Sequence, residues 1–253
     1  MPLRHKTDHM NPIREKNLPE NGGKLKTVPP PVRRFRIVLF QGYLIFATAA
    51  FLILTILAKA TSYSSFDLAI TQFIQRYHPS WFISLMVFIT QIGNTLEAII
   101  IIGLLSLAIY LLRFRWEAVV GIISATLTLL VDTTIKIFIH RPRPAADLVN
   151  VFQQLNDFSF PSGHVMLYTT FFGFMLFLIY TLLKKSLLRN LLLLFFSIPI
   201  LLVGPSRVYL GEHWASDVLG AYFLGSLVLW AMIWIYRWGK PKFFVKKDGQ
   251  PKA

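Results

Sequence analysis

Long apolar runs separated by short polar stretches dominate the chain after residue 36. The first run, residues 37–58, holds 22 residues without a charged side chain, and a helix of that length crosses a ~30 Å hydrocarbon layer at ~1.5 Å per residue. Similar runs predict further spans at about residues 96–112, 118–139, 164–183, 187–203 and 215–236. The pattern therefore predicts an all-α polytopic membrane protein, a bundle of six transmembrane helices.

Two segments between the first and second spans depart from this pattern. Residues 59–80 carry apolar side chains at helical spacing beside polar ones, which favours a short helix along the membrane interface, although an ordinary loop fits equally well. Residues 81–112 are too long for one straight crossing and are interrupted at Gly93-Asn94-Thr95. We expect a partly embedded segment before the interruption and the second span after it.

Composition agrees with a membrane protein, because the chain is 55% hydrophobic and only 15% charged. It has no cysteine, which excludes disulfide frameworks, thiolate metal sites and cysteine nucleophiles. Residues 1–36 are polar, basic and rich in proline and glycine, so we expect a flexible tail without a removable signal peptide. Residues 239–253 are expected to form a second basic tail, which leaves residues 37–238 as one membrane domain.

Basic side chains lie mainly on one side of the predicted bundle. Of the 26 Lys and Arg residues, 20 fall in the two tails and the loops around residues 113–115 and 184–189, and five fall at the opposite side. The positive-inside rule then places both termini in the cytoplasm. The tails are expected to face anionic lipid headgroups, and since neither carries a nucleic-acid motif, the net charge of +14 predicts no nucleic-acid partner.

Several ionisable side chains converge near the outer ends of the predicted spans, at one membrane depth. Lys136, Arg143 and Arg207 bring three cations together, and few neutralising carboxylates are expected nearby. Ser162 and Gly163 open the fourth span, where unpaired backbone N–H groups and the positive end of the helix dipole attract anions. A phosphate group is the natural guest of such a site.

His213 and Asp217 are four residues apart at the start of the last span and therefore share one face of a helix. The carboxylate is expected to hold one imidazole nitrogen while the other faces the guest, which is the arrangement of an activated nucleophile or base. Asp132 is expected either to pair with Lys136, one turn further along its helix, or to form a hydrogen bond within the bundle. Arg141 has two interpretations, a headgroup anchor, which we favour, and a second phosphate ligand.

Three motifs occur in order: Lys136-(six residues)-Arg143-Pro144, then Pro161-Ser162-Gly163-His164, then Ser206-Arg207-(five residues)-His213-(three residues)-Asp217. This series closely resembles the three-part signature of the type-2 phosphatidic acid phosphatase, or lipid phosphate phosphatase, superfamily. Every defining position is present, and the signature with its spans covers about residues 80–238. The resemblance implies that residues 37–238 form a six-helix membrane phosphatase domain.

The resemblance also implies roles for individual residues. His213 resembles the nucleophile that becomes a phosphohistidine, with Asp217 holding its ring. His164 resembles the acid that protonates the leaving oxygen and the base that later activates water. The implied phosphate-binding residues are Lys136, Arg143, Ser162, Gly163 and Arg207.

No metal and no cofactor is required by this scheme. The outer carboxylates Asp147, Asp157 and Glu212 are too scattered along the chain to predict a metal site, and no histidine pair has zinc-binding spacing. Asn94, near the outer start of the second span, either lines the cavity or makes the polar helix–helix contact that is commoner for such residues.

The predicted activity is removal of a terminal phosphate from a membrane lipid phosphate or pyrophosphate, of the phosphatidic acid or phosphatidylglycerophosphate type. The alternatives are a polyprenyl (undecaprenyl) pyrophosphate phosphatase, a lipid phosphotransferase and a non-enzymatic lipid-phosphate carrier, which would not need two histidines. We expect a multi-pass protein of the bacterial cytoplasmic membrane with its site facing outward. The sequence indicates no oligomeric state.

Overall fold

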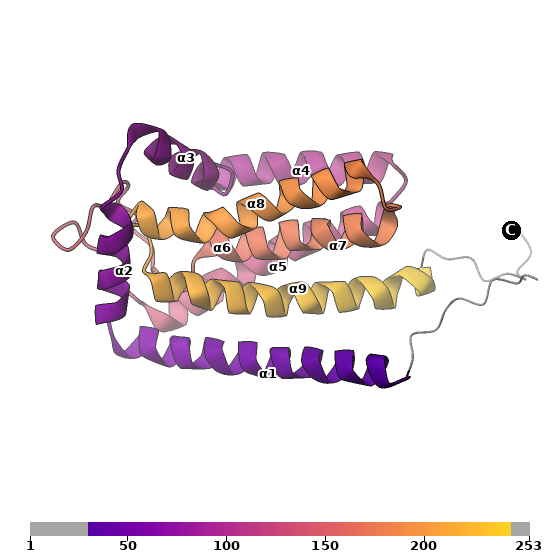
Figure 1. Cartoon of the computed structure of the whole chain (residues 1–253), viewed down its shortest axis with the longest axis horizontal. Helices are drawn as coiled ribbons and strands as arrows, with labels where there is room; N and C mark the ends of the chain where they lie inside the picture. Colours follow the sequence, from indigo (N-terminus) through magenta and orange to yellow (C-terminus); the bar gives the residue numbers. More distant parts are fainter. Residues whose placement is uncertain (1–29, 244–253) are drawn as a thin grey trace, which may run out of the picture. The chain divides into compact units, whose positions relative to one another are not determined.

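A computed structural model describes residues 30–243 of the chain (Figure 1). Residues 1–29 and 244–253, which make up most of the two predicted tails, lie outside the described residues. The chain divides into two compact units, residues 1–42 and 43–253. All candidate site residues belong to the second unit, so the description below concerns that unit.

The described residues are helical and contain no strand, as the hydrophobic pattern predicts. The helices are α1 (Pro30–Ala60), α2 (Ser65–Gln75), α3 (Ser80–Gln91), α4 (Thr95–Leu111), α5 (Arg115–Ile139), α6 (Gly163–Leu167), α7 (Gly173–Leu182), α8 (Leu187–Tyr209) and α9 (Ala215–Phe243), with a π-helical turn, η1 (Tyr168–Phe172), joining α6 to α7. Within residues 30–243, five helices are long and apolar enough to cross a membrane, and the bent pair α3–α4 brings the number to six if it is one span. The protein is therefore a polytopic, all-helical membrane protein.

The interruption predicted at Gly93-Asn94-Thr95 separates α3 from α4, whose axes differ by 63°. The short helix predicted within residues 59–80 is α2, and a capping box begins it. The Ser64 hydroxyl accepts a hydrogen bond from the Asp67 N–H, while the Asp67 carboxylate accepts one from the Ser64 N–H, so two otherwise unpaired donors are satisfied. In Figure 1, α2 crosses the neighbouring ends of α8 and α9.

The continuous segment α6–η1–α7, called the central helix below, is the most enclosed of the candidate spans, and most of its residues are buried. Its side chains form much of the apolar core, including Phe171, Phe174 and Met175. Figure 1 shows α5, α8 and α9 running alongside this segment. His164 lies in the first turn of this central helix, near the ends of the neighbouring helices.

Helix α8 runs to Tyr209, six residues beyond the predicted end of that span. Two prolines lie inside it, and the turn before Pro205 is completed by a side chain. The Tyr222 hydroxyl accepts from the Gly204 N–H at 3.2 Å and donates to the Ile200 carbonyl at 2.6 Å. It therefore connects two backbone groups that are four residues apart and would otherwise bond to each other in a regular helix. The continued helix carries Arg207 on its last turn.

Two residues with positive φ turn the chain at the end of the bundle that carries the motifs. His140, at φ 58°, ends α5 and leads the chain into the loop of residues 140–162. Gly211, at φ 67°, lies between α8 and α9, and a Cβ there would lie 2.1 Å from the Asn150 carbonyl oxygen. Only glycine fits this turn, which packs the loop before His213 against the loop after α5.

Candidate active site

A cavity of about 910 Å³ opens where α4, α5, α6 and the loops around residues 153–158 and 212–213 meet. Six of the eight site residues predicted from the sequence line it: Lys136, Arg143, Gly163, His164, Arg207 and His213. They come from the end of α5, the following loop, the start of α6, the end of α8 and the turn before α9. The fold thus brings the three motifs onto one surface.

The other two predicted residues lie behind this surface. Asp217 is completely buried beside His213. Ser162 is also completely buried, and its hydroxyl has no hydrogen-bond partner among the described residues. Gly163 lines the cavity next to Asp132, whose Oδ2 would lie 2.9 Å from an added Cβ, so a larger residue at this position would collide with that carboxylate.

The contact between His213 and Asp217 differs from the direct hydrogen bond that their spacing predicts. Nδ1 of His213 lies 3.7 Å from Oδ2 of Asp217, and the Ser159 hydroxyl lies beside both. That hydroxyl donates to Oδ2 at 2.5 Å and lies 3.4 Å from Nδ1. Oδ2 also accepts from the Trp214 N–H at 2.8 Å. Several donors therefore fix the carboxylate.

The other nitrogen of His213, Nε2, faces the cations. Nη1 of Arg143 lies 3.1 Å from Nε2 and also donates to the Glu212 carbonyl at 2.5 Å. Because a guanidinium can only donate, Nε2 must accept, and the ring proton of neutral His213 belongs on Nδ1, toward Ser159 and Asp217. Burial lowers the pKa of His213 well below its usual 6.5, and Arg143 lowers it further. Nε2 of neutral His213 thus carries no proton and accepts from Arg143 at the cavity.

His164 lies on the same cavity, next to the break between α3 and α4. Its Nε2 is 3.3 Å from the amide oxygen of Asn94. A Cβ on Gly93 would lie 2.4 Å from Cδ2 of His164 and 2.8 Å from Cε2 of Tyr168, so the glycine lets the break pack directly against the imidazole. The interruption in the second apolar segment therefore packs directly against His164.

The expectation of few neutralising carboxylates is wrong. Lys136 Nζ lies 2.9 Å from Asp157 and 3.3 Å from Asp132, which also confirms the predicted pair one turn apart. Arg143 binds the same Asp157 carboxylate, with Nη2 at 2.6 Å. The loop after α5 brings Asp157 to both cations, although Asp157 is 21 residues from Lys136 in the sequence.

Arg207 is also paired, because it forms an ion pair with Glu212 and donates to the hydroxyl of Thr90. Burial raises the pKa of Glu212, against the lowering effect of Arg207. Burial has the same effect on Asp157, but Lys136 and Arg143 outweigh it and lower the pKa of Asp157 to about 2. Each of the three cations, Lys136, Arg143 and Arg207, is thus paired with a carboxylate of the chain in this structure.

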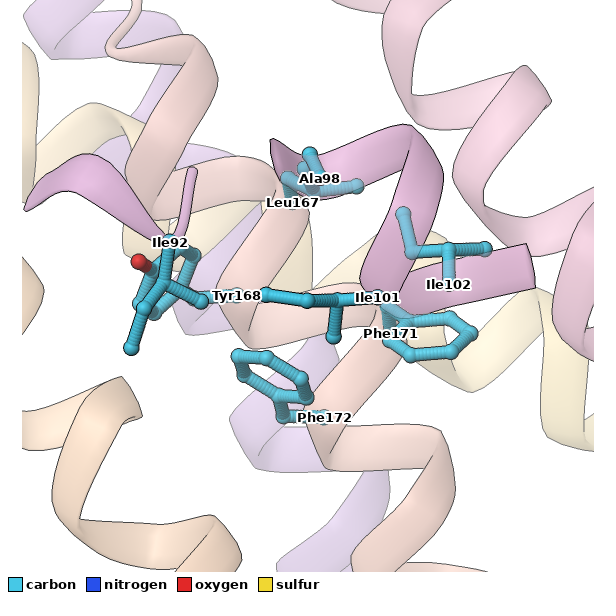
Figure 2. A pocket seen from close by; sticks show the side chains of 8 residues that line it. All are labelled: Ile92, Ala98, Ile101, Ile102, Leu167, Tyr168, Phe171 and Phe172. Carbon is cyan, nitrogen blue, oxygen red and sulfur yellow. The ribbon is translucent and has the colours of Figure 1, made fainter. Parts of the chain in front are cut away.

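A second, much smaller pocket of about 10 Å³ lies beside the cavity. Figure 2 shows its wall of apolar side chains from α4 and from the central helix, among them Ile101, Leu167 and Phe172. Its volume is about that of one water molecule and its surface is apolar, so it is a packing defect and no substrate site. The larger cavity is the one that the motif residues line.

Comparison with known proteins agrees with the motifs. The sequence profile of the PAP2 superfamily matches residues 114–241, half of the chain, and this stretch carries all three motifs. The chain belongs to the PAP2 superfamily. Phosphatidylglycerophosphatase B of Bacillus subtilis (strain 168) is 30% identical to it over 180 residues, which cover 70% of this chain and 87% of that protein.

Solved structures extend the agreement to the fold. The crystal structure of a transmembrane PAP2-type phosphatidylglycerolphosphate phosphatase from Bacillus subtilis matches with a TM-score of 0.65 and 26% identity, over 81% of this chain and 98% of that one. Aquifex aeolicus LpxE matches in fold, with a TM-score of 0.53 and 20% identity over 66% of this chain and 93% of that one. Membership of the PAP2 superfamily makes this protein a membrane phosphatase.

Sequence reasoning assigned Arg141 of this PAP2 phosphatase wrongly. Its side chain is only 2% exposed and pairs with Asp67 and Asp217, so it is neither a headgroup anchor nor a phosphate ligand on the cavity. Ser159 escaped notice because a lone serine in a loop carries no motif. Of the two expectations for Asn94, cavity lining is confirmed, whereas its contact with His164 required the fold.

Among the described residues, no group of three or more metal-ligating side chains comes together. The sequence prediction that the reaction needs no metal stays a prediction, since it concerns turnover and calls for an activity measurement in the presence of a chelator.

Proposed function

We propose that this phosphatase removes a terminal phosphate from a membrane lipid phosphate through a phosphohistidine on His213. The observation that carries the proposal is the orientation of that ring. Nε2 faces the cavity and the Arg143 guanidinium, while Nδ1 faces Ser159 and the buried Asp217. One nitrogen is thus available to phosphorus, and a carboxylate stabilises the positive charge that the ring acquires.

In the first step, Nε2 of His213 attacks phosphorus, and the bond between phosphorus and the lipid oxygen breaks. His164, on the same cavity, donates a proton to the departing oxygen, and the lipid leaves as a neutral alcohol. Nδ1 keeps its proton, so the phosphorylated ring is cationic beside Asp217. The products of this step are phosphohistidine and the dephosphorylated lipid.

In the second step, water attacks phosphorus while His164, now neutral, accepts a proton from it. The bond between phosphorus and Nε2 breaks, inorganic phosphate leaves, and both histidines return to their starting states. In each step the charge on the phosphoryl oxygens is met by Lys136, Arg143 and Arg207, since phosphoryl transfer depends mainly on positioning and charge neutralisation. The Gly163 N–H at the start of the central helix is a further donor, and the Ser162 carbonyl closes that first turn by accepting from the Met166 N–H at 3.0 Å.

Beyond the cations, the cavity wall is apolar and favours a substrate with a lipid tail. Side chains of α4 and α5 line it, including Ile102, Gly103, Ile122 and Leu129. On α5, the distance along the axis from Lys136 to Ile122 is about 21 Å, at ~1.5 Å per residue. A hydrocarbon chain placed along this wall stays in the bilayer while its phosphate reaches the cations.

Among lipid phosphates, we propose phosphatidylglycerophosphate as the first substrate to test. Phosphatidylglycerophosphatase B of Bacillus subtilis and the phosphatidylglycerolphosphate phosphatase structure both align with most of their length. The apolar helices support six spans, and the distribution of basic residues supports cytoplasmic termini and an extracytoplasmic site. We place the protein in the bacterial cytoplasmic membrane. On this proposal, residues 37–238 form the enzymatic domain and the basic tails at 1–36 and 239–253 lie against anionic headgroups.

The decisive experiment is release of inorganic phosphate by the purified protein from a panel of substrates in excess EDTA. The panel contains phosphatidylglycerophosphate, phosphatidic acid, undecaprenyl pyrophosphate and glycerol 3-phosphate, with His213→Ala as control. We expect release from lipids, least from glycerol 3-phosphate, and none with the variant. Transfer of phosphate to a second lipid without release would instead identify a phosphotransferase, and binding without either reaction a carrier.

A further inference from the structure

A buried ionic network lies behind the nucleophile, away from the cavity. Arg141 places Nη1 2.5 Å from Oδ1 of Asp217 and Nη2 2.9 Å from Oδ2 of Asp67. Both carboxylates are completely buried. One guanidinium therefore joins an acid at the start of α9 to an acid in the first turn of α2.

The remaining polar groups of this network are paired as well. Nε of Arg141 donates to the Ser62 carbonyl at 3.1 Å, and Nη1 also donates to the Ser216 hydroxyl at 2.7 Å. Asp67 accepts from the Ser216 N–H at 2.8 Å and from the Ser216 hydroxyl at 2.9 Å. A buried network with its donors and acceptors satisfied holds its members in one geometry.

The backbone of Arg141 acts on the same site. Its carbonyl accepts the Ser159 N–H at 2.8 Å, and the Ser159 hydroxyl donates to Oδ2 of Asp217. Arg141 thus fixes one oxygen of Asp217 with its side chain and the partner of the other oxygen with its main chain. Without this cation, the Asp217 carboxylate would be buried beside His213 with its charge uncompensated.

We infer that Arg141 is a positioning residue for phosphoryl transfer, and that Asp67 positions Arg141. The inference rests on the proposed roles of His213 and Asp217. Arg141 keeps Asp217 ionised with Oδ2 turned toward the imidazole, and Asp67 supplies the second carboxylate that a planar guanidinium fork can bridge. Two carboxylates and one guanidinium leave a net negative charge, which complements the cationic ring formed when Nε2 bonds to phosphorus.

The test is a double-mutant cycle on the rate of phosphohistidine formation, measured by rapid quench with enzyme in excess over an aryl phosphate. We expect Arg141→Gln to slow this step by about 10²-fold, the scale of a small displacement of a reacting group. The inhibition constant of inorganic phosphate should stay within about twofold, because Arg141 does not line the cavity. In an Asp217→Asn background, Arg141→Gln should change the rate by less than about twofold, since its partner is already neutral.

Two further variants keep the result interpretable. Arg76→Gln removes an exposed arginine at the end of α2 and should leave the rate unchanged. Asp67→Asn keeps an acceptor for Arg141 and Ser216 while removing the charge, so it carries the same cycle if Arg141→Gln does not fold. Equal losses in the wild-type and Asp217→Asn backgrounds would overturn the positioning role alone, whereas a wild-type rate in Asp217→Asn itself would overturn the proposed mechanism.

Discussion

Oδ1 of Asp157 accepts two hydrogen bonds from Arg143, at 3.0 Å from Nε and 2.6 Å from Nη2. The other oxygen of the same carboxylate lies 2.9 Å from Nζ of Lys136. This geometry resembles that of a bound phosphate, with two oxygens between two cations. On the proposed function, a substrate phosphate must therefore displace or share the position of Asp157, a carboxylate of this chain on a loop over the cavity.

Asp157→Asn should improve phosphate binding. Removal of the competing charge is expected to lower the inhibition constants of inorganic phosphate and vanadate about two- to fivefold, the scale of a half-exposed ion pair. Because the pKa of Asp157 is about 2, the competition should persist at every practical assay pH. Asp147→Asn, an exposed residue of the same loop, is the matched control, and weaker phosphate binding in Asp157→Asn would show that this carboxylate supports the site instead of competing for it.

Gly93→Ala should displace the His164 ring. The added Cβ would lie 2.4 Å from Cδ2 of the imidazole, so the ring must move, and a displacement of about 1 Å typically lowers turnover by about 10²-fold. Gly103→Ala is the control, because Gly103 also lines the cavity but an added Cβ there meets nothing within 4 Å. Steady-state kinetics on both variants measures the difference, and equal activities would mean that the break does not position His164.

The two histidines should be separable by leaving group. His164→Ala should slow phosphohistidine formation about 10²–10⁴-fold with a lipid phosphate monoester, whose alkoxide needs a proton, and much less with p-nitrophenyl phosphate. With the aryl substrate, the variant should show a burst of phenolate followed by slow turnover, since no base activates water. His213→Ala should show no burst. Equal loss of burst rate on both substrates in His164→Ala would assign that residue to phosphate binding.

The imidazole of His213 should remain neutral in mildly acidic solution. Burial and the neighbouring Arg143 lower its pKa, so as the pH falls the ring gains its proton only well below 6.5. Carbon-13 NMR of histidine-labelled protein, compared with His213→Gln to assign the signal, measures this titration directly. A midpoint at 6.5 or above would contradict the assignment of Nε2 as an available nucleophile at neutral and mildly acidic pH.

The proposed orientation predicts opposite accessibility of two exposed loops. The chain has no cysteine, so single cysteines need no altered background. Asn156→Cys, on the loop over the cavity, should react with an impermeant thiol reagent in intact cells, and Ser186→Cys, at the start of α8, should react only after lysis. The reverse pattern would place the active site in the cytoplasm.

The sequence by itself determined the helical class, most span boundaries, the break at Gly93 and the residues of the three motifs. These follow from local properties, because apolar length, helical spacing and glycine act within a few residues of the chain. The end of α8 was placed too early because Tyr222, on another helix, completes the turn before Pro205.

Only the tertiary structure decided which charges meet. Asp157 is 21 residues from Lys136, and Arg141 is 74 residues from Asp67, yet each pair is in contact. The structure also placed Ser159 beside Asp217 and Asn94 beside His164, although neither belongs to a motif. Such contacts depend on the path that each loop takes across the ends of the helices. Hydrophobic periodicity does not predict this path, because the residues involved are polar and lie outside the repeating pattern.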